Sequence, residues 1–107
     1  MEENSKVFSY IGFAIKSGKY KLGENSVSTI KKAHLIIICN SASTNAVDKA
    51  KQYAKKFRCE IIATVNKPLQ EYVCKPNIKI MAITDKSLAK AIIDNKGQDF
   101  IILKDNQ

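Results

Sequence analysis

The chain has 107 residues and a formal net charge of +8 at pH 7, from 18 basic and 10 acidic side chains. This length predicts one domain with a modest core, and no apolar run approaches the roughly 20 residues that a membrane-spanning helix needs. The positive charge favours an anionic partner such as nucleic acid, a membrane surface or an acidic protein, and the less favoured alternative is a solvated, lysine-rich surface.

The N-terminal residues predict a helix followed by an edge element. Residues 5–17 carry apolar side chains at helical spacing, with Ser5 as a plausible N-cap and Gly18 just past the helix end. Residues 19–22 then form a short connector or an edge strand.

The next stretch contains the strand around which the chain is organised. A weak second helix over about residues 24–32 leads into residues 33–39, which end in an unalternated apolar run. Such a run predicts a strand buried on both faces. Ser43 is placed as the N-cap of the clearest helix, residues 44–57. The loop between this strand and this helix would suit an anion, and we expect function near that edge of the sheet.

The second half of the chain continues the alternation of strands and helices. Residues 59–65 are rich in β-branched side chains and predict a strand. A short helix follows with Pro68 at its first position, and residues 78–83 predict another strand.

The C-terminal part predicts a last helix and strand. Thr84 or Asp85 caps the helix, Gly97 ends it, and residues 99–103 form a final strand. The whole order predicts a single domain over residues 1–107. Its fold class is α/β, a three-layer α/β/α sandwich around a small mixed sheet of four or five strands.

The sequence gives little support for catalysis or metal binding. Cys39, Cys59 and Cys74 form no CxxC pair, and we interpret the first two as small buried residues. His34 is the only histidine and has no ligand cluster beside it, so we expect no metal and no cofactor. No close pair of carboxylates suggests acid–base catalysis. The N-terminal residues 1–4 lack an apolar signal region, which predicts a cytoplasmic protein.

Three segments, taken in order, resemble the ribosomal protein L-seven-Ae family, and look closest to its small bacterial ribosomal-protein-like members. They are Gly23-Glu24-Asn25, residues 39–45 and residues 80–89, and the likeness covers about residues 6–94. The resemblance implies an α/β/α sandwich that binds RNA kink-turns or related bent internal loops. It implies neither catalysis nor a cofactor.

The resemblance further implies a first RNA-facing loop. Gly23 and Asn25 match the family pattern, whereas Ser26 stands where an acid is common and Thr29 where a lysine is common. The segment over residues 27–35 is about three residues shorter than usual in the family, which would shorten the second helix. Asn25 could contact RNA or could cap the helix beside Gly23.

A second RNA-facing loop in the family carries leucine-glycine before a short helix, and this chain reads Leu69-Gln70. Lysines near either loop could meet phosphate, or could be solvated surface residues. The candidate RNA-binding residues are Lys19, Lys21, Gly23, Glu24, Asn25, Ser26, Thr29, Lys31, Lys32, Asn66, Lys67, Leu69 and Gln70.

We therefore predict a non-catalytic RNA-binding domain that acts on ribosomal or other structured RNA as a monomer, without a membrane partner. Lysines would neutralise phosphates, because nearly all of the basic residues are lysine rather than arginine. The alternative is a family member that has lost kink-turn recognition and acts as a protein-interaction or assembly module. A small-molecule enzyme ranks third.

Overall fold

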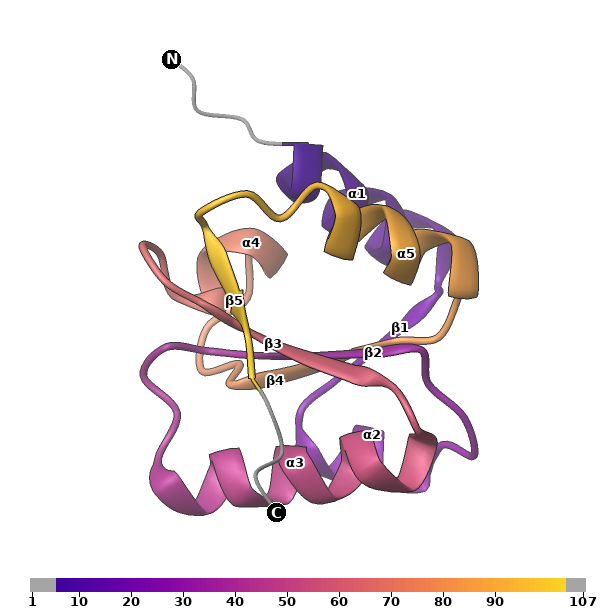
Figure 1. Ribbon diagram of the computed structural model, residues 1–107, viewed down its shortest axis with the longest axis vertical. Coiled ribbons are helices and arrows are strands. Elements are labelled where there is room, and N and C mark those ends of the chain that lie inside the picture. The colour runs from indigo at the N-terminus through magenta and orange to yellow at the C-terminus, as the bar shows by residue number, and fades with distance from the viewer. Residues whose placement is uncertain (1–5, 104–107) are drawn as a thin grey trace.

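The computed structural model describes residues 6–103, so the expected N-cap at Ser5 lies outside the described residues. Helices and strands alternate along most of the chain (Figure 1). In order they are α1 (Lys6–Ser17), β1 (Tyr20–Leu22), α2 (Glu24–Thr29), β2 (Leu35–Ile38), α3 (Thr44–Phe57), β3 (Glu60–Thr64), α4 (Leu69–Val73), β4 (Ile80–Ile83), α5 (Lys86–Asp94) and β5 (Phe100–Ile102).

The strands form one mixed sheet in the order β1-β4-β2-β3-β5. Only β2 and β3 run parallel, and the remaining neighbours are antiparallel. Ile37 in the central strand lies opposite Ile62 on one side and Met81 on the other. This arrangement confirms the predicted α/β class and its small mixed sheet.

Helices cover both faces of the sheet, with α1, α4 and α5 on one face and α2 and α3 on the other (Figure 1). Successive side chains of a strand point to opposite faces. Leu35 and Ile37 accordingly pack in the core under α1, α4 and α5, while Ile36 and Ile38 pack in the core over α2 and α3. All of β2 is buried, as its unalternated apolar run predicted.

Local signals fixed several helix ends. The Ser43 hydroxyl accepts a hydrogen bond from the Ala46 N–H at 3.1 Å, so α3 begins where the sequence placed it. Asp85, rather than Thr84, caps α5 and accepts from the Leu88 N–H at 2.9 Å. Gly18 follows α1 with a φ of 74°, a left-handed conformation that glycine adopts without strain.

Other predicted ends were displaced by a few residues. The second helix stops at Thr29, because Ile30 is already extended, and does not reach residue 32. Pro68 is the N-cap of α4 and not its first residue. The last helix ends at Asp94 before reaching Gly97, where Asn95 caps it: its backbone N–H and its side-chain amide both donate to the Ala91 carbonyl, at 3.1 and 2.8 Å.

Within residues 6–103, no helix combines the length and the apolar composition that crossing a bilayer requires.

Candidate nucleic-acid interface

One edge of the sheet gathers most of the loops named by the sequence. Strands β1, β2 and β3 end there, while β4 and β5 begin there. Backbone hydrogen bonds join the loops at this edge: the Gly23 N–H donates to the Ile80 carbonyl at 2.9 Å, and the Cys39 N–H donates to the Lys79 carbonyl at 2.9 Å. We call this set of loops, over residues 23–26, 39–43, 65–70 and 74–79, the loop edge.

Asn40 fixes the ends of the two parallel strands to each other. Its backbone N–H donates to the Thr64 hydroxyl at 2.8 Å, and its side-chain amide donates to the Val65 carbonyl at 3.0 Å. Thr64 is a fully covered polar residue, and this bond satisfies its hydroxyl, as a buried polar group requires. The middle of the loop edge is therefore held in one geometry.

The Cys39 thiol connects two further loops. It accepts a hydrogen bond from the Leu69 N–H at 3.3 Å and lies 3.2 Å from the Ser41 hydroxyl. That hydroxyl also accepts from the Lys79 ammonium at 2.7 Å. Burial raises the pKa of the thiol, but the hydrogen bonds from Ser41 and Leu69 and the Lys79 charge outweigh burial and lower it. Cys39 is thus buried, as predicted, and also an acceptor that ties β2 to α4.

The first predicted RNA-facing loop lies between β1 and α2. Gly23 is the N-cap of α2, with a φ of 85° and no side-chain cap bond. Asn25 therefore does not cap the helix, and its side chain is exposed. Glu24 instead turns to α3, where its carboxylate meets the Lys49 ammonium at 3.0 Å. The Thr29 hydroxyl donates to the Ser26 carbonyl at 2.7 Å, so it is occupied within its own helix.

The second predicted loop precedes α4. The Asn66 amide donates to the Asp99 carboxylate at 3.2 Å, and Leu69 is fully buried in the core, so the Leu69 side chain cannot touch a ligand. Gln70 accepts from the Asn77 N–H at 3.3 Å and thereby closes the turn into β4.

Lys67 lies over aromatic rings, with its ammonium 5.9 Å from the centroids of both Phe8 and Tyr72. These contacts hold an exposed cation against the molecule at the end of the loop edge. Burial, together with Asp99 and Glu71, raises the pKa of Tyr72 to about 12, so the ring beneath the cation stays neutral.

A polar cavity of about 410 Å³ joins the first loop to the turn after α4. Lys21 and Ser26 line it from β1 and α2, and Lys75 enters it from the turn before β4. The sequence did not single out Lys75 or Lys79 as site residues. Both lysines precede β4, and the pairing of β4 with β1 brings this turn beside Gly23.

Other candidate lysines lie at the opposite edge of the sheet. Lys19 precedes β1, and its ammonium is 3.6 Å from the Asp85 carboxylate. Lys31 and Lys32 are exposed on the connection from α2 into the start of β2. Since β1 runs towards the loop edge and β2 starts away from it, these three residues lie at the opposite ends of the strands from Gly23.

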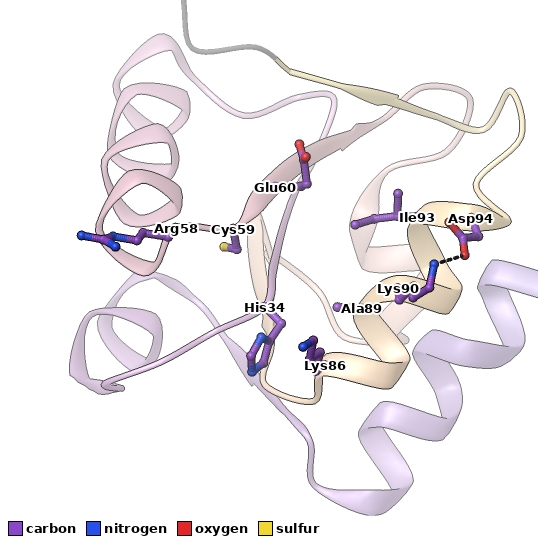
Figure 2. A pocket seen from close by; sticks show the side chains of 9 residues that line it. All are labelled: His34, Arg58, Cys59, Glu60, Lys86, Ala89, Lys90, Ile93 and Asp94. Atoms are coloured by element: carbon purple, nitrogen blue, oxygen red, sulfur yellow. Dashed lines mark hydrogen bonds and ion pairs between the residues drawn. The ribbon is translucent and has the colours of Figure 1, made fainter.

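The opposite edge also contains a cavity of about 540 Å³ (Figure 2). Charged residues of both signs line it: Arg58 and Lys86 as well as Glu60, and Lys90, which is paired with Asp94 at 3.1 Å.

The Cys59 thiol also lines that cavity. Burial and the neighbouring Glu60 raise the pKa of Cys59 to about 11, which keeps its thiol protonated at neutral pH. In the part of the chain that the structure describes, no three His, Cys, Asp or Glu side chains group to hold a metal ion.

The sequence matches no protein-family model and no curated protein. Among solved structures, the chain is similar to "The structure of a protein with unknown function from Bacillus halodurans C", with a TM-score of 0.74 and 16% sequence identity. The match covers 85% of this chain and 96% of that one. At this identity the likeness concerns the fold alone.

Proposed function

We propose that the protein binds structured RNA through the loop edge, without catalysis. The observation that supports this most is the polar cavity in which Lys21, Ser26 and Lys75 meet. Two segments distant in sequence, residues 18–26 and the turn at Lys75, there present two cations and a hydroxyl to the same space. Phosphate contacts by lysine supply most of the sequence-independent affinity of proteins for nucleic acids.

The charge balance of the loop edge favours a polyanion. Lys67 and Lys79 are exposed there in addition to the cavity lysines. Of the nearby acids, Glu24 pairs with Lys49 and Asp99 accepts from Asn66, while Glu71 is exposed beside Tyr72. Four lysines thus stand against three acids, so the edge carries a modest excess of positive charge, which favours a polyanion.

Selectivity for kink-turns should be weaker than in the family that the sequence resembles. Ser26 and Thr29 are neutral and short, and the Thr29 hydroxyl is occupied inside α2. Gln70 adds side-chain bulk where the family has glycine, and it is fixed to Asn77. Each lost charged or bidentate contact removes about 1–3 kcal/mol of discrimination. Asn25, exposed at the start of α2, is the side chain we expect to carry the remaining selectivity.

The proposal implies a monomer acting in the cytoplasm on ribosomal or other structured RNA. Its free thiols, one of them exposed at Cys74, agree with a reducing compartment, where disulfides are rare.

The test compares two double variants of equal charge change. Lys21→Ala/Lys75→Ala removes the cavity lysines, while Lys31→Ala/Lys32→Ala removes two exposed lysines at the opposite edge. Each protein is titrated with one kink-turn RNA and a matched straight duplex at several salt concentrations. We expect the first variant to weaken binding and to flatten the slope of log affinity against log salt by about one unit per lost contact. The control should change the slope much less. Equal effects, or no RNA binding by the unaltered protein, would reject the assignment.

A further inference from the structure

The outward face of α1 exposes an apolar side chain that the fold leaves uncovered. Val7, Ile11 and Ala14 are buried on the inward face, and α1 packs there against α4 and α5. On the outward side Phe13 remains 55% exposed. A single exposed aromatic residue is ordinary, but half-buried Phe8 lines the same hollow as Phe13 and makes the apolar surface continuous, which marks an interaction site.

Gly12 deepens this face. It lies in the middle of α1, where glycine destabilises a helix by about 0.5–1 kcal/mol relative to alanine. A Cβ placed at Gly12 would meet no heavy atom within 4 Å, so the packing of the fold does not require glycine there. The result is a shallow groove of about 380 Å³ lined by Phe8, Ser9, Gly12, Phe13 and Lys16.

The charges around the groove restrict what can occupy it. α1 contains no acidic residue, and exposed lysines stand near its two ends, at Lys6 and Lys16. A second copy of this face would bring lysines against lysines in either orientation. An occupant with apolar side chains in its centre and carboxylates towards its ends would match both features.

We propose that the outward face of α1 docks an acidic amphipathic helix of a partner protein. A helix suits it because Ser9, Phe13 and Lys16 form one straight exposed ridge of α1, whose 12 residues span about 18 Å, and a second helix can pack along such a ridge. An apolar partner side chain would sit over Gly12, against Phe13, while acidic residues would face Lys6 and Lys16. The groove adjoins the loop edge at Phe8, over whose ring the Lys67 ammonium lies at 5.9 Å. The inference rests on residues of α1 alone and does not depend on RNA binding.

The test is a display library of short helical peptides, selected against the full-length protein and against two variants. Gly12→Leu fills the floor of the groove, and Phe13→Ser removes the exposed ring. Neither change should unfold the protein, because the space beside Gly12 is open and Phe13 is largely exposed. Circular dichroism checks this. A further variant, Gly12→Ala, should raise thermal stability, because it removes only the helix penalty of glycine.

We expect the unaltered protein to enrich acidic helices with apolar residues at helical spacing. The enriched peptides should bind each of the two variants at least about tenfold more weakly, and their binding should weaken with added salt. Enrichment of no peptide, of basic peptides, or of the same peptides by both variants would overturn the proposal. So would sedimentation showing self-association that Phe13→Ser abolishes. RNA affinity that falls in Phe13→Ser as much as peptide affinity would assign the face to RNA instead.

Discussion

The two-sided burial of β2 can be tested by truncating its neighbouring isoleucines one at a time. Ile36 and Ile37 are both fully buried but belong to different cores, on opposite faces of the sheet. Replacing either by alanine removes carbon atoms worth about 0.8 kcal/mol each in transfer free energy. The cavity left behind adds to this loss, so each variant should lose about 2–5 kcal/mol of unfolding free energy.

Such a loss is large for a domain of this size. A chain of 107 residues is expected to have a total unfolding free energy of about 5–15 kcal/mol, and the melting temperature should fall by about 10 °C or more. Ile101→Ala is the matched control, since Ile101 lies in the same sheet but is 51% exposed. That variant should stay within about 0.5 kcal/mol of the unaltered protein.

Urea unfolding followed by circular dichroism measures all three variants, with an unchanged slope against urea as the check on two-state behaviour. The decisive comparison is between Ile36→Ala and Ile37→Ala. If one of them behaved like Ile101→Ala, one face of the sheet would be open, and the three-layer description would be refuted.

Three further outcomes follow from the caps and the cysteines. Ser43→Ala should destabilise the fold by about 1 kcal/mol in urea unfolding, because the first turn of α3 loses its cap; unchanged stability would contradict that role. The hydrogen bond from the Leu88 N–H holds the pKa of Asp85 below its usual range. The ionised Asp85 carboxylate therefore stabilises the fold above the carboxyl pKa of the unfolded chain, and this stabilisation is lost as the pH falls through the lower pKa of the folded state. Asp85→Asn should therefore weaken the fall in unfolding free energy as the pH is lowered into the acid range, and an unchanged fall would contradict the capping role of Asp85. Iodoacetamide at neutral pH should label exposed Cys74 well before Cys59, whose pKa is raised by burial; the reverse order by mass spectrometry would argue against that burial.

Several features of this fold could be predicted from local sequence because local physics decides them. The bounds of α3 follow from its helical apolar stripe and from the hydroxyl of Ser43, which satisfies a backbone donor of its first turn. The burial of β2 followed from its unalternated run, which only a sheet covered on both faces can accommodate. The errors were displacements of a few residues at the ends of helices and strands: β4 begins at Ile80 and not at residue 78, and α5 ends where Asn95 caps it and not at Gly97.

The composition of the candidate site depended on tertiary structure. Lys19 and Lys21 are two residues apart, yet Lys19 faces Asp85 beyond the start of β1, whereas Lys21 lines the cavity with Lys75. No sequence spacing relates Lys21 to Lys75. They meet because β4 pairs with both β1 and β2, which brings the turn before β4 beside the start of α2.

The same dependence explains why Leu69 was a poor candidate for direct contact. A leucine at the start of a short helix can face RNA or the core, and its neighbours in sequence do not decide between them. Its N–H meets Cys39 and its side chain fills the core beneath α1, because burying apolar surface stabilises the fold wherever the chain can close over it. Sequence by itself determined which segments are helix, strand and cap, since those choices rest on neighbours within a few residues. Which of the exposed cations share a surface was decided only by the order in which the strands pair.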